Sequence, residues 1–157
     1  MKIQRILCPI DFSEPSRAAL REGTALARQF GAVLELLHVY QIPGYTLPDG
    51  VIFPGPEAMN QLFERIDQSL LEWRREAERL GVKLVETRTV QGVPWQEIVD
   101  SAEKGRCDLI VIGTHGHTGI KHFLLGSVAE RVVRHANCPV LTVREEATAH
   151  PQPEAIP

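Results

Sequence analysis

Residues 109–135 read LIVIGTHGHTGIKHFLLGSVAERVVRH and contain three patterns in succession. Leu109–Ile112 is an uninterrupted apolar run, which is typical of a strand buried on both faces of a parallel sheet. Glycines punctuate the loop from Gly113 to Gly126, and Ser127–His135 then has the composition of a helix. A buried strand that leads through a glycine-rich loop into a helix indicates an α/β fold.

The same alternation of strands and helices extends outward from this stretch. Ser13 is a predicted N-cap with Pro15 in the first turn behind it, and Gly31 is the predicted end of that helix. The order βαβαβαβαβ predicts a single-domain open α/β sandwich, in which a five-stranded parallel sheet has helices on both faces. The predicted strands are Ile3–Ile10, Val33–Val39, Val82–Val90, Leu109–Ile112 and Pro139–Arg144, and the helices between them cover 13–31, Glu57–Leu80, Trp95–Glu103 and Ser127–His135.

Two segments fall outside this alternation. Tyr40–Pro56 carries four prolines and three glycines, and we interpret it as one long loop of the kind that often forms a lid. Residues 145–157 hold three prolines and no apolar pattern, which predicts a domain over 1–145 followed by a disordered tail over 146–157.

Composition narrows the class of protein. The chain has 157 residues, 43% of them hydrophobic, which is enough for one packed core. No apolar run approaches the roughly 20 residues of a membrane-spanning helix, and no signal peptide is visible, so we expect a cytoplasmic protein. The net charge of −3 argues against non-specific nucleic-acid binding. The three cysteines lack metal-site spacing and are expected to be reduced, although Cys107 and Cys138 precede neighbouring strands and a redox pair is conceivable.

The glycine-rich loop is the candidate binding element. Gly113, Gly116 and Gly119 precede a helix whose first N–H groups and macrodipole suit an anion such as phosphate. The spacing matches neither the dinucleotide fingerprint nor the P-loop. Two alternatives stay open at this point: the glycines are ordinary turn residues, and Ser127 with Glu130 forms a capping box that needs no ligand.

Strand order brings a second polar segment to this loop. In an open α/β sheet a ligand lies beyond the carboxyl ends of the strands, where the strand order reverses. With the order 3-2-1-4-5, that point lies between the first and fourth strands. Asp11 leaves the first strand there and the Gly113 loop leaves the fourth, so the two segments converge on one predicted crevice.

At these residues the chain resembles the universal stress protein family, in its ATP-binding branch. The resemblance covers about residues 2–144. The family signature G-x2-G-x9-G-[ST] is carried by Gly113, Gly116, Gly126 and Ser127. Pro9-Ile10-Asp11 matches the element at the end of the first strand, and Cys138-Pro139 precedes the closing strand as it does in many members.

The resemblance implies a nucleotide site and a dimer. Adenine is expected near Asp11 and Val39 with Ile112 against the base, Gly113 beside the ribose, and the phosphates on Gly116 and the start of the fourth helix. ATP is the expected ligand, with ADP or AMP as alternatives, and Mg2+ accompanies the phosphates in many members, although no side chain here is a convincing metal ligand. The expected homodimer is joined through the last strand at Val140, Leu141 and Val143. The predicted nucleotide-contacting residues are Pro9, Ile10, Asp11, Val39, Ile112, Gly113, His115, Gly116, Gly126, Ser127 and Val128.

The function that follows is a nucleotide-binding regulatory module of the stress response, because no pairing of a nucleophile with a general base is evident. A slow ATPase or phosphotransferase that uses His115 or His117 as base is the enzymatic alternative. A nucleotide-free interaction protein is a third hypothesis. Zinc binding by His115, His117 and His122 lacks cysteine or carboxylate partners and a suitable spacing.

Overall fold

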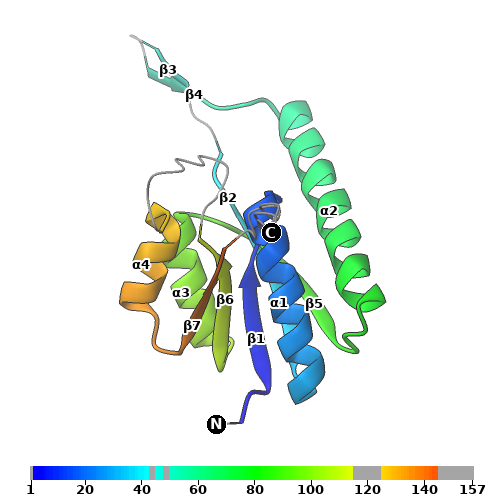
Figure 1. Ribbon diagram of the computed structural model, residues 1–157. Helices are drawn as coiled ribbons and strands as arrows, with labels where there is room; N and C mark the ends of the chain where they lie inside the picture. Colours follow the sequence, from blue (N-terminus) through cyan, green and yellow to red (C-terminus); the bar gives the residue numbers. More distant parts are fainter. Residues whose placement is uncertain (1, 43–44, 48–49, 115–124, 145–157) are drawn as a thin grey trace, which may run out of the picture.

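The computed structural model describes residues 2–42, 45–47, 50–114 and 125–144, and side chains within these ranges except over 43–52 (Figure 1). A five-stranded parallel sheet forms its centre, with the strand order β5-β2-β1-β6-β7. This is the predicted order 3-2-1-4-5, and the α/β sandwich is confirmed. The strands are β1 (Arg5–Pro9), β2 (Val33–Tyr40), β5 (Val85–Gln91), β6 (Leu109–Gly113) and β7 (Val140–Val143).

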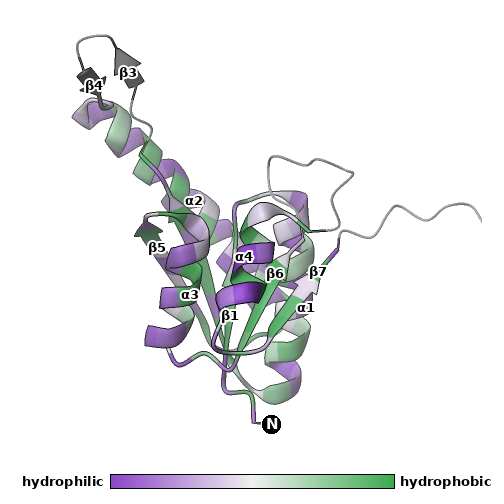
Figure 2. Ribbon diagram, turned by 90° about the vertical axis from the view of Figure 1, so that its left-hand side faces the viewer, coloured by the Kyte–Doolittle hydropathy of each residue, from purple (hydrophilic) through white to green (hydrophobic). Residues whose placement is uncertain are grey.

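Four helices cover the two faces of the sheet (Figures 1 and 2). The helices α1 (Glu14–Phe30) and α2 (Pro56–Arg79) pack on one face, and α3 (Pro94–Lys104) and α4 (Ser127–His135) pack on the other. Within the described residues, no helix is both long enough and apolar enough to cross a membrane.

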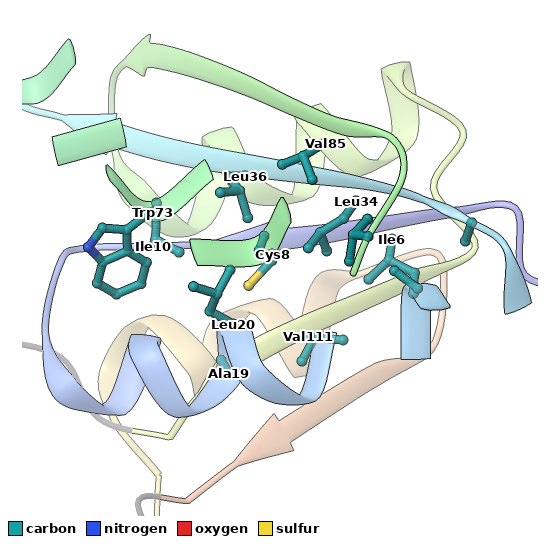
Figure 3. Close-up of a cluster of buried hydrophobic side chains, with 14 of the residues drawn as sticks. Ile6, Cys8, Ile10, Ala19, Leu20, Leu34, Leu36, Trp73, Val85 and Val111 are labelled. Atoms are coloured by element: carbon teal, nitrogen blue, oxygen red, sulfur yellow. The ribbon is translucent and has the colours of Figure 1, made fainter. Parts of the chain in front are cut away.

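Strand alternation divides the core into two layers. Ile6 and Cys8 of β1 belong to the layer beneath α1 and α2. In this layer Leu20 lies beside Cys8, and Trp73 lies farther along, beside Ile10 (Figure 3). Leu7 of the same strand belongs to the layer beneath α3 and α4. Both layers are fully buried around β1, which is why the central strands read as continuous apolar runs.

The two ends of α1 confirm the predicted caps. Ser13 has an extended backbone, and its side chain accepts a hydrogen bond from the amide of Ser16 at 3.4 Å. Pro15 lies in the first turn, where its missing N–H has no consequence. Gly31 ends the helix in the left-handed conformation with φ of 65°, which glycine adopts without steric penalty.

The prediction of an unstructured loop over Tyr40–Pro56 is wrong. This segment contains the antiparallel hairpin of β3 (Tyr45–Leu47) and β4 (Gly50–Ile52), which stands apart from the main sheet beyond the start of α2 (Figure 1). The sequence carries a partial signal for it, because Asp-Gly is a common hairpin dipeptide, although the register pairs Leu47 with Gly50 and so places Gly50 in β4 and not in the turn. Residues 48 and 49 themselves lie outside the described residues.

The predicted disordered tail over 146–157 also lies outside the described residues.

Candidate functional site

A pocket of about 210 Å³ opens at the carboxyl end of the sheet, at the strand-order reversal between β1 and β6. Its walls come from the ends of β1, β2 and β6 and from the first turns of α1, α3 and α4. The convergence of the segments after the first and fourth strands is therefore observed. The lining residues are Pro9, Ile10, Asp11, Ser16, Leu37, Val39, Pro94, Ile98, Ile112, Gly113, Thr114, Gly126, Ser127, Val128 and Ala129.

One side of the pocket is apolar. Leu37, Ile98 and Ile112 are buried in the core beneath it, and Val39 packs against the same cluster. Pro94, the first residue of α3, adds a rigid apolar edge. A slot of this kind accommodates a flat, largely apolar group such as a nucleobase.

The opposite side is the start of α4. Gly126 is the N-cap, with φ of −68° and ψ of 156°, and its amide donates to the carbonyl of Thr114 at 2.5 Å. The first bond within the helix runs from the amide of Glu130 to the carbonyl of Gly126 at 2.9 Å. The amides of Ser127 and Val128 precede that bond and have no acceptor inside the helix. Together with the helix dipole they form a binding element for an anion.

The predicted capping box at Ser127 is wrong. Ser127 is the first residue inside the helix, one position too late to serve as N-cap, and no side-chain cap bond forms at this end of α4. Glu130 instead reaches forward to Arg134, with an ion pair at 2.7 Å. The Ser127 hydroxyl at the pocket wall is therefore not explained by capping.

Asp11 supplies the carboxylate of the pocket. Its Oδ1 accepts hydrogen bonds from the amide of Ser13 at 3.1 Å, from the hydroxyl of Ser16 at 2.6 Å and from the hydroxyl of Ser13. The Asp11 amide in turn donates to Ser16 Oγ at 3.3 Å. This network fixes the carboxylate against the first turn of α1, at the edge of the pocket.

Gly113 has a structural reason to be glycine. A Cβ at this position would lie 2.7 Å from the carbonyl oxygen of Pro15 and 3.2 Å from the amide nitrogen of Ser16. Both atoms belong to the backbone of α1, which cannot turn aside as a flexible side chain does. The glycine therefore lets the first turn of α1 approach the end of β6, and this close approach closes one wall of the pocket.

The model of the universal stress protein family matches residues 2–144. The chain belongs to this family. It is 38% identical over 144 residues to universal stress protein MJ0531 of Methanocaldococcus jannaschii, covering 90% of this chain and 82% of the relative. The solved structure of MJ0577 from the same organism superposes with a TM-score of 0.77 at 31% identity, covering 94% of this chain and all of that one. A universal stress protein solved in complex with cAMP has a TM-score of 0.68 at 28% identity, with coverage of 92% and 98%.

Every predicted site residue of this universal stress protein that the structure describes lines the one pocket. His115 and Gly116 lie outside the described residues, as do Gly119, His117 and His122. The sequence reasoning missed six residues of the wall. Strand periodicity offers a signal for Leu37, two positions before Val39. The missed residues are Ser16, Leu37, Pro94, Ile98, Thr114 and Ala129.

The three cysteines of this family member are free thiols. Complete burial raises the pKa of Cys8 to about 12. Burial, with a smaller effect of the Glu35 carboxylate, raises the pKa of Cys107 to about 11. The pKa of Cys138 is also raised, again chiefly by burial. A thiol must ionise to attack a disulfide, so these pKa values give no support to a redox pair of Cys107 and Cys138.

Proposed function

We propose that this universal stress protein binds an adenine nucleotide, ATP in the first place, in the pocket between β1 and β6. One observation carries the proposal: an apolar slot, a fixed carboxylate and the start of a helix line the same cavity at the strand-order reversal. These are the three groups that a base, a ribose and a phosphate chain require. The family relative solved with cAMP lends further support.

The pocket suggests a direction for the ligand. The base lies against Ile112 and Val39, and the Asp11 carboxylate accepts a hydrogen bond from a donor of the nucleoside. The phosphates lie at the amides of Ser127 and Val128, next to Gly126, whose own amide is bonded to Thr114. We assign the signature glycine Gly116 and its neighbour His115 to the phosphate end as well, from their place in the sequence alone.

The side chains around the pocket limit how the protein could coordinate Mg2+. Within the described residues, no group of three or more His, Cys, Asp and Glu side chains could hold a metal ion. We therefore propose that any Mg2+ in the site is coordinated chiefly by the phosphate oxygens and water, as this ion prefers.

We propose a regulatory binding module as the role of the protein, with a cytoplasmic location. Nucleotide binding in the pocket would change a surface that a partner recognises. Phosphate release by the purified protein that disappears in a His115→Ala variant would instead favour the ATPase alternative.

Ser127 offers a sharp test of the phosphate assignment. Proline is favoured at the first position of a helix, and the extended backbone of Gly126 is the conformation that a following proline requires. Ser127→Pro therefore removes one amide N–H from the proposed anion site while α4 remains intact. Ser127→Ala is the matched control, because it removes the hydroxyl and keeps the amide.

Titration calorimetry with ATP and Mg2+ separates the contribution of the Ser127 amide from that of its hydroxyl. We expect Ser127→Pro to weaken ATP binding by roughly tenfold to a hundredfold, the range for hydrogen bonds to a charged group. Ser127→Ala should weaken it less. Full ATP affinity in Ser127→Pro would contradict the phosphate assignment, and no ATP binding by the unchanged protein would contradict the proposed function.

The observed backbone at Gly126 changes the explanation of one variant that the sequence suggests as a test. The sequence predicts that Gly126→Val abolishes nucleotide binding, on the expectation that Gly126 adopts a backbone conformation that β-branched residues resist. The observed φ of −68° and ψ of 156° are accessible to valine. Any effect of Gly126→Val therefore comes from the bulk of its side chain, which makes Ser127→Pro the cleaner test.

We also propose a homodimer joined through β7. This strand is an edge of the sheet, and the side chain of Leu141 is 38% exposed there. An exposed apolar edge strand is a template for pairing with a second copy. Leu141→Lys should shift the sedimentation of the protein to that of a monomer, and an unchanged sedimentation coefficient would contradict this interface.

A further inference from the structure

Phe12, between the pocket residue Asp11 and the helix cap Ser13, has an unusual backbone. Its φ of 65° lies in the left-handed region, which bulky residues rarely adopt. Such a conformation persists only where the surroundings fix it, and it is concentrated at ligand sites. Contacts on both sides of the turn hold it in place.

His38 holds the turn from the side of the sheet opposite the pocket. Its Nδ1 lies 2.9 Å from the carbonyl oxygen of Ile10, and because a carbonyl can only accept, Nδ1 carries the proton and donates. Strand alternation explains its placement, since Leu37 and Val39 on either side of it line the pocket.

The ring of Phe12 is fixed in the same region. Its ring centroid lies 4.5 Å from that of His38, with an angle of 30° between the ring planes. It meets Trp73 of α2 edge-on, with 5.7 Å between the ring centroids. On the pocket side, Ser13 and Ser16 hold the Asp11 carboxylate. One turn is thus held by contacts on both of its sides, with Asp11 at its centre.

We propose that His38 is a positioning residue for the nucleotide site. Its hydrogen bond to Ile10 and its contact with Phe12 hold the turn that directs the Asp11 carboxylate into the pocket. The inference rests on the proposed function, because it assigns His38 to the nucleoside half of that site. The ligand group it serves is a hydrogen-bond donor, an amino group of the base or a ribose hydroxyl, since a carboxylate accepts.

A core histidine with a satisfied hydrogen bond is the competing explanation. Loss of such a residue lowers stability without changing which part of a ligand is recognised. A positioning role makes a narrower prediction, because the phosphates are assigned to α4 on the other wall of the pocket. Variants of His38 should then weaken recognition of the nucleoside and spare recognition of the phosphates.

Two substitutions separate the hydrogen bond from the ring. His38→Phe keeps an aromatic ring against Phe12 and loses the donor to Ile10. His38→Asn loses the ring, and its side-chain amide can donate from near the position of Nδ1. Phe12→Leu is a further variant that keeps an apolar side chain but removes the ring contact with His38.

Calorimetric titration of ATP and of tripolyphosphate, at a temperature where all variants are folded, provides the test. For His38→Phe we expect about a tenfold loss of ATP affinity, the effect of one hydrogen bond, and less than about a twofold change for tripolyphosphate. His38→Asn should restore ATP affinity to within about threefold of the unchanged protein, and Phe12→Leu should weaken ATP alone.

An unaltered ATP affinity in His38→Phe, or an equal loss for ATP and tripolyphosphate, would overturn the positioning role while leaving the proposed function in place. Absence of ATP binding by the unchanged protein would overturn both.

Discussion

A methyl group added at Gly113 should destabilise this protein, although alanine is otherwise a mild replacement for glycine. The new Cβ would lie 2.7 Å from the carbonyl oxygen of Pro15 and 2.8 Å from its carbonyl carbon, where ordinary contacts begin at 3.4 Å. Both atoms belong to the backbone of α1. The first turn of the helix must therefore move by roughly half an ångström or more, a shift typical of an overpacked core.

The expected loss of stability for Gly113→Ala is about 1–3 kcal/mol, the usual range for overpacking. For a chain of this size, this corresponds to a fall in melting temperature of roughly 3–10 °C. The moved turn carries Ser16, which holds the Asp11 carboxylate, so ATP affinity should fall as well.

Gly23→Ala, within α1 and facing the same sheet, is the control. A Cβ at Gly23 would lie 3.4 Å from Leu34 Cδ1 and 3.8 Å from Val111 Cβ, which are ordinary contacts. Alanine inside a helix is favoured over glycine by about 1 kcal/mol, so this variant should be more stable than the unchanged protein. Urea unfolding of the unchanged protein and of the two variants, monitored by circular dichroism, gives the change in the free energy of unfolding for each variant.

The same substitution, glycine to alanine, should therefore lower the free energy of unfolding at Gly113 and raise it at Gly23. If Gly113→Ala unfolds at the same urea concentration as the unchanged protein, the close approach of α1 to β6 does not constrain this position. The glycine would then be required for the ligand alone.

Three further predictions concern buried polar groups. Burial lowers the pKa of His38 below its ordinary 6.5, so the unfolded chain takes up the proton first as the pH falls. Stability should therefore decline below about pH 6.5, and His38→Asn should make urea unfolding less dependent on pH over this range. The buried Glu35 carboxylate pairs with Arg88 at 2.6 Å and with Arg5 at 3.3 Å. Both arginines are partly exposed and can be solvated, so Glu35→Ala should lower the free energy of unfolding by about 1–3 kcal/mol in the same assay. Iodoacetamide at pH 8, followed by mass spectrometry, should label the partly exposed Cys138 well before Cys8, whose pKa is about 12; equal rates would contradict the burial of Cys8.

The start of α4 illustrates how far local sequence patterns reach. The sequence predicts a helix over Ser127–His135, and the structure has the same bounds. It also predicts Ser127 as the cap, one residue too late. The S-x-x-E pattern cannot decide whether Glu130 bonds backward to a cap or forward to Arg134, since both partners are within reach on a helix.

The hairpin of β3 and β4 is an error of a different kind. Its strands have three residues each, too short for a periodicity to be recognised among four prolines. The dipeptide Asp49-Gly50 favours a hairpin nearby, but it is one residue out of register with the observed pairing of Leu47 with Gly50.

Patterns along the chain were sufficient to predict the succession of strands and helices and the buried character of β6. These properties follow from periodicity, caps and chain connectivity, which are local or topological. Packing in three dimensions was needed to see that Gly113 must admit the backbone of Pro15, that Ser16 bonds to Asp11, and that the ring of His38 lies against Phe12. Those properties depend on distances between atoms of different helices, strands and turns, and such distances are set only when the helices pack on the sheet.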